Sequence, residues 1–361
     1  MSAVPYNVRL SDGADSLIIL DQRRLPLEEA YLELHTREEL FDAIRSLAVR
    51  GAPAIGIAAG YGYYLCARED ADKPDFFSRM DDAERYLASA RPTAVNLFRA
   101  LARMRACLKR NALSDRGELI EKLRLEAEAI QREDVGANVK ISEAGLTLMQ
   151  PGMGVLTHCN AGPLATSLYG TALGPILLAQ ERGYAPKVFA DETRPLMQGA
   201  RLTAYELNRA GVDVTLICDN MAGQVMREGR VQAVFVGCDR AAMNGDCANK
   251  IGSASLAVLA KHYSVPFYVF MPLTTADPDT LSGDGIRIEE RAPEEVTELF
   301  FRSRIAPDGI KVYNPAFDVV DHSLITAIVT EEGVLRPPFD VSLRDALERS
   351  RSRAGDRSRK E

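Results

Sequence analysis

Five short apolar runs, each followed at once by polar residues, limit the possible folds of this chain most strongly. In chain order they are Gly154–Thr157 before His158-Cys159-Asn160, Lys187–Ala190 before Asp191-Glu192, Val212–Ile217 before Cys218-Asp219, Ala233–Val236 before Gly237-Cys238-Asp239, and Pro266–Phe270 before Met271-Pro272. A helix-like segment lies between successive runs. Strands that alternate with helices predict βα units, and therefore a parallel sheet with helices on both faces. The polar residues would gather at the carboxyl ends of the strands, where ligands bind in such sheets.

The first part of the chain has a different character. Tyr6–Leu10 and Leu17–Asp21 are typical of a hairpin, and Ala54–Arg68 is a small, apolar segment typical of a buried helix whose glycines allow close packing. Further elements are expected as a strand at Tyr31–His35 and helices after Thr36 up to Val49, over Phe76–Ala90, over Thr93–Lys109 and over Glu118–Met149.

These patterns predict an α/β protein in three parts. Residues 1–150 form a mainly helical N-terminal domain with a small β-sheet, residues 151–345 form a Rossmann-like parallel-sheet domain, and residues 346–361 form a charged tail that is expected to fray.

Composition narrows the function classes. The net charge of −7 does not favour a nucleic-acid partner, and six cysteines without a CxxC pair argue against a zinc ribbon or a disulfide scaffold. The apolar stretch Ala52–Ala67 is too short and too rich in glycine to span a bilayer, and Met1–Arg9 does not begin a signal peptide. We therefore expect a cytoplasmic protein with no membrane association.

The stretch Ala233–Ser253 places two charged residues in one loop region. Asp239 follows an expected strand, and Asn249-Lys250 precedes an apolar segment, Ile251–Ala260, that is expected to be a helix. A lysine beside a helix N-terminus suits an anion. A capping aspartate and a solvated lysine explain the same residues without any ligand.

Cys159 is a candidate nucleophile or base. Gly162-Pro163 begins the next expected helix, and a nearby helix N-terminus lowers the pKa of a thiol. A carboxylate such as Asp239, in a mostly dry site, could act as an acid beside it. A free cysteine is also often a small buried apolar residue. The acids Asp191, Glu192 and Asp219 are expected to cap helices or to hold arginines.

Two arginines are candidate anion ligands. Arg50-Gly51-Ala52 combines a guanidinium with backbone amides ahead of a helix, and Arg91 before Pro92 is a weaker case. Each arginine alone fits a surface role equally well. Together with Lys250 they would suit one phosphate group.

Several unusual segments occur together, and with them the chain resembles the methylthioribose-1-phosphate isomerases. The segments are RGAPAIGIAAGYG (50–62), RPTAVNL (91–97), THCNAGPLAT (157–166), YGTALG (169–174), ADETRPLMQGARLTAYEL (190–207), DNMAG (219–223), GCDRAAMNGDCANKIGS (237–253) and NPAFDVV (314–320). The resemblance implies an aldose–ketose isomerase of methionine salvage that acts on a sugar phosphate. It also implies a homodimer without a metal or an organic cofactor.

The resemblance also implies roles for single residues. The catalytic pair would be Cys159 in THCNAG and Asp239 in GCDR. The implied substrate-binding residues are Arg50, Gly51, Ala52, Arg91, Gln198, Asn249 and Lys250. Cys238 departs from the family pattern, in which alanine is expected.

Two other functions stay open. A non-catalytic regulatory subunit of a translation-initiation guanine-nucleotide exchange factor would share the fold, although the presence of both Cys159 and Asp239 favours an enzyme. An isomerase of 5-deoxyribose 1-phosphate or ribose 1,5-bisphosphate would differ only in its substrate, because an apolar slot discriminates poorly against a smaller group.

Overall fold

The computed structural model describes residues 5–92 and 94–357, which form two compact units. One unit takes Met1–Gly136 and Pro163–Gly170, and the other takes Ala137–Gly162 and Thr171–Glu361. The sequence places the boundary at residue 150, whereas the units divide at Gly136. The helix that spans the boundary, Arg116–Leu146, explains the difference. Near its end, Gly145 packs against Phe270 and Pro175 of the second unit.

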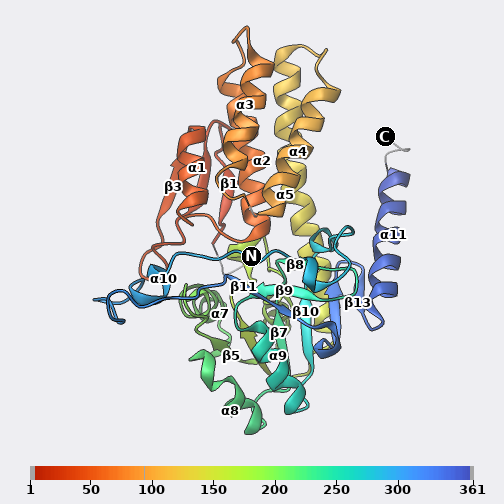
Figure 1. The fold of residues 1–361 in the computed structure, drawn as a ribbon. Helices are drawn as coiled ribbons and strands as arrows, with labels where there is room; N and C mark the ends of the chain where they lie inside the picture. The colour runs from red at the N-terminus through yellow and green to blue at the C-terminus, as the bar shows by residue number, and fades with distance from the viewer. Residues whose placement is uncertain (1–4, 93, 358–361) are drawn as a thin grey trace. The chain divides into compact units, whose positions relative to one another are not determined.

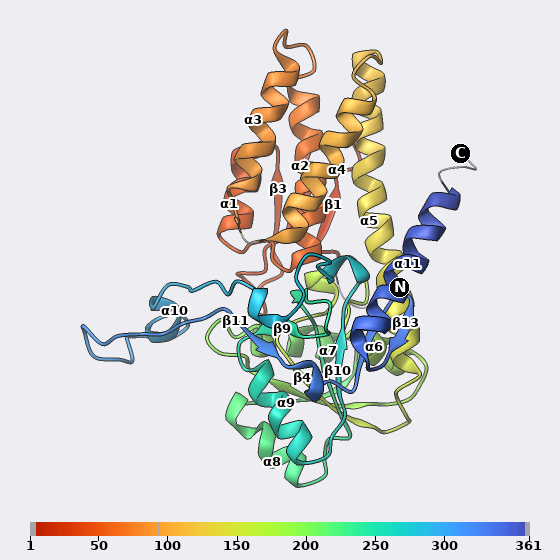
Figure 2. The same ribbon diagram turned by 45° about the vertical axis from the view of Figure 1, so that its right-hand side comes forward.

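The first unit combines a small sheet with helices. Strands β1 (Val8–Leu10), β2 (Leu17–Leu20) and β3 (Tyr31–Leu34) form an antiparallel sheet in that order. The helices are α1 (Arg37–Arg45), α2 (Ala52–Glu69), α3 (Phe76–Ala88), α4 (Val95–Arg110) and most of α5 (Arg116–Leu146), as Figures 1 and 2 show. Thr36 caps α1 in a capping box with Glu39. The expected start of the fourth helix, Thr93, lies outside the described residues.

Helix α2 forms the centre of the first unit, and the expectation of a buried, closely packed helix is confirmed. Its residues from Ala54 to Tyr64 are all buried. A β-carbon at Gly56 would lie 3.0 Å from the backbone oxygen of Asn96 in α4, and one at Gly62 would overlap the Leu40 side chain of α1. These glycines therefore allow the neighbouring helices to approach closely, which offsets their cost of roughly 1 kcal/mol each in helix propensity.

The second unit is built on a seven-stranded sheet in the order β13-β12-β10-β7-β4-β5-β6. Its strands are β4 (Gly154–His158), β5 (Lys187–Asp191), β6 (Asp213–Ile217), β7 (Ala233–Val236), β10 (Phe267–Phe270), β12 (Ala327–Thr330) and β13 (Gly333–Leu335). All neighbouring pairs are parallel except β12 with β13. The predicted fold class, including the five strands read from the apolar runs, is confirmed.

The second unit also contains helices. They are α6 (Gly174–Glu181), α7 (Ala204–Arg209), α8 (Ala222–Arg227), α9 (Ser253–His262), α10 (Glu294–Thr297) and α11 (Phe339–Arg357), with a π-helical turn at Gly199–Thr203. Strands β4, β7 and β10 carry no exposed residue, which explains their mainly apolar sequences.

The chain order of the strands creates a switch point beside β4. From β4 the chain adds β5 and β6 on one side, and then returns to place β7, β10 and β12 on the other. Ligands of open parallel sheets bind where the strand order reverses in this way. The carboxyl ends of β4 and β7 are therefore the expected position of a site.

A second, smaller sheet corrects one prediction. Strands β8 (Arg240–Ala241), β9 (Cys247–Lys250) and β11 (Phe317–Val320) pair in the antiparallel order β11-β9-β8. Lys250 therefore ends a strand and does not stand at a helix start. Helix α9 begins later, at Ser253.

The expected charged tail, residues 346–361, is helical as far as Arg357, and its residues 358–361 lie outside the described residues. Helix α11 continues through Arg357, the last described residue. Arg353 Nη1 donates to Oε1 of Glu332, a 5%-exposed carboxylate that follows β12, at 3.1 Å. Arg353 Nη2 lies 2.9 Å from Oε2 of the same carboxylate, and Arg349 lies 3.8 Å from it. These ion pairs tie the charged helix to the second unit.

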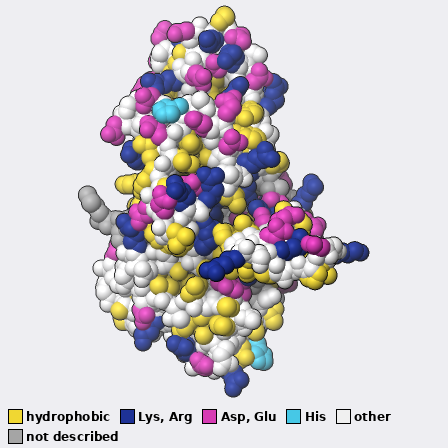
Figure 3. Space-filling model, turned by 90° about the vertical axis from the view of Figure 1, so that its left-hand side faces the viewer, with side chains coloured by type: hydrophobic (Ala, Val, Ile, Leu, Met, Phe, Trp, Pro, Cys, Tyr) yellow, Lys and Arg dark blue, Asp and Glu magenta, His cyan; other side chains and the backbone are white. Residues whose placement is uncertain are grey.

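Over residues 5–92 and 94–357, no helix is long and apolar enough to cross a membrane. On the face drawn in Figure 3, acidic and basic side chains are interspersed.

Candidate functional site

The two predicted catalytic residues follow the two strands that flank the switch point. His158, the last residue of β4, pairs with Val236, the last residue of β7. Cys159 comes directly after β4, and Asp239 comes three residues after β7. Both side chains are therefore attached at the carboxyl ends of adjacent parallel strands.

Gly237 brings the two connections together. A β-carbon on Gly237 would lie 2.8 Å from Cβ of Ala161 and 3.9 Å from Oδ1 of Asn249. The loop after β4 thus packs directly against the backbone just before Asp239, and Asn249 lies at the same position. The structure therefore gathers three predicted site regions within the second unit.

Cys159 has a left-handed backbone conformation, with φ of 69°. Its N–H donates to Thr193 Oγ1 at 2.9 Å, and its carbonyl accepts from Thr203 Oγ1 at 2.6 Å. The side chain is half-buried. Such a conformation costs a non-glycine residue about 1–3 kcal/mol and persists only where neighbours hold it.

The expected helix N-terminus near Cys159 is absent among the described residues. Pro163–Ala165 is a single 3-10 turn, and α6 begins only at Gly174. The prediction that a helix N-terminus activates the Cys159 thiol is therefore wrong. The two threonine hydrogen bonds hold the Cys159 backbone instead.

Asp239 is exposed, whereas the sequence predicts a mostly dry site around it. Its N–H donates to the carbonyl of Ala248, so the β8–β9 hairpin fixes its backbone. The neighbouring Cys238 thiol donates to the same carbonyl at 3.6 Å, and burial together with the adjacent Cys247 raises its pKa well above the usual value. Cys238 therefore favours the protonated thiol and is a structural neighbour of the site.

Lys250 and Asn249 are buried at the end of β9. Lys250 Nζ donates to the carbonyl of Ala316 at 2.8 Å and lies 4.7 Å from the ring centre of Phe317. Asn249 Nδ2 donates to Ser253 Oγ at 2.8 Å. Burial of an ammonium is costly, and hydrogen bonds such as the one to Ala316 offset part of that cost.

The N-terminus of α9 is already occupied by a carboxylate. Asp318 of β11 accepts the N–H of Gly252 at 2.7 Å and the N–H of Ala254 at 3.1 Å. Burial raises the pKa of Asp318, although these two hydrogen bonds oppose the shift. An anion site at this helix start, as the sequence suggested, is therefore not available.

Gln198 is 5% exposed, and its Oε1 has no hydrogen-bond partner within residues 5–92 and 94–357. Leaving a buried polar atom unsatisfied costs about 1–3 kcal/mol. The following Gly199 packs against the carbonyl of Asp191, where no β-carbon would fit, and this places Gln198 beside the end of β5. An orphaned acceptor beside the carboxyl end of a central strand is typical of a ligand site.

The remaining predicted residues belong to the first unit. Gly51 has φ of 93° and forms the N-cap of α2, and no described side chain caps this helix. A β-carbon there would lie 2.5 Å from the backbone of Ala165, so only glycine fits. Arg50, Ala52 and Arg91 are half-buried. The geometry described above for the second unit does not test the predicted roles of these four residues.

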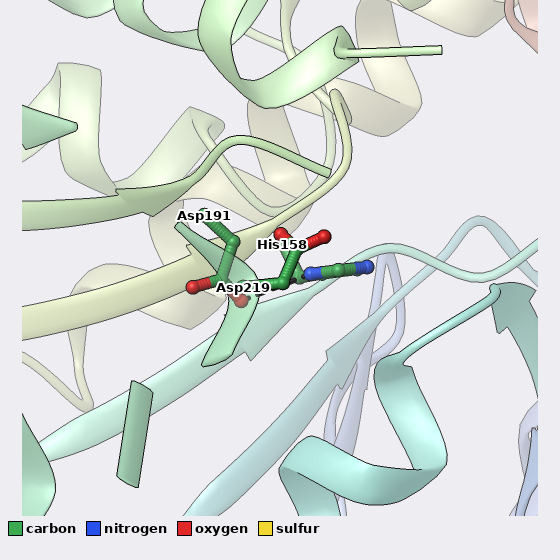
Figure 4. A group of neighbouring side chains, drawn as sticks. All are labelled: His158, Asp191 and Asp219. Carbon is green, nitrogen blue, oxygen red and sulfur yellow. Dashed lines mark hydrogen bonds and ion pairs between the residues drawn. The ribbon is translucent and has the colours of Figure 1, made fainter. Parts of the chain in front are cut away.

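The sequence alone predicts no role for His158, which in the structure lies beside Asp191 and Asp219 (Figure 4). Its Nδ1 lies 2.9 Å from Asp191 Oδ2, and its Nε2 lies 2.9 Å from the carbonyl oxygen of Ile251. The available signal was a histidine that ends an apolar strand directly before the candidate cysteine.

His158, Asp191 and Asp219 also resemble a metal site, because their ligand atoms lie within 4.8 Å of one another. However, both nitrogens of His158 already face acceptors, and Asp219 accepts the backbone N–H groups of Thr193 and Arg194 at 2.7 Å each. A metal would need an unprotonated ring nitrogen. The hydrogen bonds therefore favour a structural network.

Comparisons with known proteins extend over nearly the whole chain. A model of the initiation factor 2 subunit family matches residues 48–337. A methylthioribose-1-phosphate isomerase from Symbiobacterium thermophilum is 61% identical over 344 residues, which are 95% of this chain and 96% of that protein. A 5-deoxyribose 1-phosphate isomerase from Petrotoga mobilis is 51% identical over 350 residues, which are 96% and 100% of the two chains.

Solved structures of similar proteins also match nearly the whole chain. The crystal structure of 5-methylthioribose 1-phosphate isomerase from Pyrococcus horikoshii OT3 superimposes with a TM-score of 0.90 and 42% identity, covering 96% of each chain. The structure of translation initiation factor eIF-2B, subunit delta, from A. fulgidus gives a TM-score of 0.86 and 44% identity, covering 96% of this chain and 100% of that chain.

Proposed function

Because this chain belongs to the initiation factor 2 subunit family, we propose that it is an aldose–ketose isomerase that converts 5-methylthio-D-ribose 1-phosphate into 5-methylthio-D-ribulose 1-phosphate. The observation that carries the proposal is the placement of Cys159 and Asp239 after β4 and β7, on either side of the switch point. The names of the most similar relatives support the same activity. In this role the protein acts in methionine salvage and so in methionine biosynthesis.

The substrate chemistry explains the need for two groups. Its anomeric oxygen carries the phosphate, so a free aldehyde cannot form by simple ring opening. An acid must assist opening of the ring, and hydrogen must then move from C2 to C1. Asp239 is the proposed acid and proton relay, because its exposed carboxyl can reach a substrate. Cys159 is the proposed base at C2, or the group that stabilises the transition state of a hydride shift.

Three further residues of the second unit are proposed substrate ligands. Gln198 offers a buried acceptor to a sugar hydroxyl, and Lys250 offers a buried ammonium to an anion. Asn249 lies within reach of Gly237, beside both catalytic connections. Each of them stands at or near the carboxyl end of a strand, as the proposal requires.

For Arg50, Gly51, Ala52 and Arg91 the proposal rests on their sequence motifs. The N-terminus of α2 supports it, because its first amides have no side-chain cap among the described residues. Amides at a helix start bind phosphate well, and a neighbouring guanidinium strengthens that binding.

A second substrate also has specific support. Relatives about half identical to this chain over nearly its full length are named 5-deoxyribose 1-phosphate isomerases. The two sugars differ only at the 5-substituent, and an apolar slot separates such groups by about 1–3 kcal/mol. A non-catalytic regulatory subunit has less support, because both catalytic residues are present.

The deciding experiment measures turnover of 5-methylthioribose 1-phosphate, 5-deoxyribose 1-phosphate and ribose 1,5-bisphosphate by the purified protein. We expect the highest kcat/KM with the methylthio sugar. A higher value with the deoxy sugar would transfer the assignment to that substrate, and no turnover of any of the three would favour a regulatory subunit.

The same assay with substrate deuterated at C2 separates the two chemical routes. Loss of deuterium to solvent indicates proton abstraction and an enediol. Full retention of deuterium at C1 favours a hydride shift, with Cys159 as a stabilising group. No cofactor is part of the proposal, and a cytoplasmic location is proposed with it.

A further inference from the structure

His158 is buried between two groups that both need a proton from it. Its side chain is 2% exposed, and the carbonyl oxygen of Ile251, 2.9 Å from Nε2, can only accept a hydrogen bond. Nε2 must therefore carry a proton. On the other side, Nδ1 faces a carboxylate oxygen of Asp191, which is also 2% exposed.

The charged groups around the ring favour a second proton on Nδ1. Burial opposes protonation of His158, but the hydrogen bond from Nδ1 and the negative charge of Asp191 outweigh it and raise the pKa of His158. Burial also raises the pKa of Asp191, to about 6, against the opposing effect of His158. Asp219 and Asp318 also face the ring from other elements, and both are acidic. An imidazolium is thus surrounded by carboxyl groups.

Asp191 is connected to the Cys159 backbone through Thr193. Thr193 Oγ1 accepts the N–H of Cys159 and donates to the backbone carbonyl of Asp191 at 3.1 Å. His158 and Cys159 are adjacent, so the side chain of one and the backbone of the other are both fixed to Asp191. The strained turn at Cys159 is therefore held from both sides.

The other nitrogen of His158 reaches the end of β9. Ile251 directly follows Lys250, and its carbonyl oxygen is the acceptor of Nε2. The ring also packs against Gly252, where a β-carbon would lie 2.9 Å from Cε1. One imidazole thus connects the end of β4, at Cys159, with the end of β9, at Lys250.

We propose that His158, protonated on both ring nitrogens and paired with Asp191, is a positioning residue that fixes the Cys159 turn relative to Lys250. The role rests on the proposed function, since it concerns the geometry of the isomerase site. His158 does not exchange a proton with the substrate in this proposal. It holds the catalytic thiol and the anion-binding ammonium at a fixed separation.

The protonation state can be measured without any activity assay. The chain has four histidines, so nitrogen-15 NMR of protein labelled at histidine gives few signals, and His158→Gln identifies the one that belongs to His158. At neutral pH we expect both nitrogens of His158 to carry protons. In Asp191→Asn we expect a neutral ring with its proton on Nε2. A neutral His158 in the unmodified protein would overturn the ion pair.

Kinetics test the positioning role. His158→Gln and Asp191→Asn should each lower kcat by about 10²-fold, because displacements near 1 Å at a reacting group have effects of this size, and should raise KM less. Asp191→Asn should also shift the alkaline limb of the kcat profile to lower pH, since the carboxylate that raises the pKa of His158 is gone. A purely packing role would not move that limb.

Matched controls separate these outcomes from misfolding. His262 is exposed on α9 of the same unit, and His262→Gln should leave both kcat and the profile unchanged. Thermal unfolding and circular dichroism establish whether each variant is folded. If His158→Gln does not fold, Asp191→Asn provides the test. Normal kcat in both folded variants, or an unmoved alkaline limb, would overturn the proposal. If Cys159→Ser retains full activity, the catalytic assignment fails, while the NMR result still decides the ion pair.

Discussion

At the scale of single residues, Cys159 combines a strained backbone with a half-buried side chain. Its left-handed φ and its hydrogen bonds to Thr193 and Thr203 fix the direction in which its side chain leaves the end of β4. Strain of this kind is found at functional sites, where the surrounding structure compensates for it. Asp239, in contrast, is exposed, and its backbone N–H donates to the carbonyl of Ala248 in the small sheet.

Removing either chemical group should affect turnover more than binding. Cys159→Ser keeps the shape but loses the acidic thiol, and Asp239→Asn keeps the shape but loses the proton. Because general acid–base steps contribute about 10²–10⁴-fold, kcat should fall at least 10²-fold in each variant, with a smaller change in KM. Steady-state kinetics provide the measurement.

Cys218→Ser is the matched control, because Cys218 follows β6 at the same edge of the sheet and is also half-buried. It should retain normal kcat. If Cys159→Ser and Asp239→Asn also retain it, the pair is structural.

Arg50→Ala tests the predicted phosphate contact. If Arg50 pairs with the phosphate, its loss should weaken substrate binding by about 2–4 kcal/mol, and KM should rise accordingly. Arg45→Ala, an exposed arginine of α1 in the same unit, should leave KM unchanged. An unaltered KM and kcat for Arg50→Ala would remove Arg50 from the site.

At the scale of elements, β11 stabilises the start of α9. Asp318 accepts the N–H groups of Gly252 and Ala254, so it replaces the side-chain cap that Gly252 lacks. Asp318→Ala should lower the free energy of unfolding by about 1 kcal/mol, as the loss of an N-cap does. Urea denaturation measures it, and Asp308→Ala, which changes a fully exposed carboxylate, should have almost no effect.

The same residue makes stability depend on pH. Burial raises the pKa of Asp318 above its usual value of 3.8, so the folded chain binds this proton more tightly than the unfolded chain does. The contribution of Asp318 to stability is therefore largest below 3.8 and decreases as the pH rises through the folded-state pKa. Asp318→Asn cannot titrate, so the difference in unfolding free energy between it and the unmodified protein should change over this pH range. A constant difference would contradict the shift.

The elements also show what local sequence can and cannot reveal. Strands β4, β5, β6, β7 and β10 each contain a short apolar run, so each can be recognised without its neighbours, and the parallel sheet follows from their alternation with helices. Strand β9 has no such signal, because Lys250 pairs with Phe317 and Asn249 pairs with Asp318, residues far along the chain. Lys250 was therefore expected at a helix start.

The candidate site, like the fold, was predictable from the sequence only in part. The positions of Cys159 and Asp239 at strand ends followed from the same alternation, and the switch point then places those strands side by side. The partners of His158 lie on β5 and after β9, so only the folded structure reveals them. The helix predicted after Cys159 is absent from the described residues because Pro163 starts a single 3-10 turn.

At the scale of the whole molecule, we expect a homodimer, as the resemblance to the isomerases implies. Light scattering at micromolar concentration should give about twice the 39.6 kDa mass of the chain. A monomer at that concentration would count against the prediction. At protein concentrations low enough for the dimer to dissociate, the specific activity should fall only if the active site needs both subunits.

The path of the chain between the two units has a consequence for the evolution and engineering of the protein. After Gly162 the backbone leaves the second unit, contributes Pro163–Gly170 to the first, and returns at Thr171. In the first unit, Leu164 accepts hydrogen bonds from Asn7 and Gln22, and Ala165 fills the space beside Gly51. A gene fragment that ends at Gly136 would therefore encode a first unit with unsatisfied amides and a gap at the start of α2. Neither unit can be exchanged between proteins by a single recombination event, so the two are expected to be inherited together.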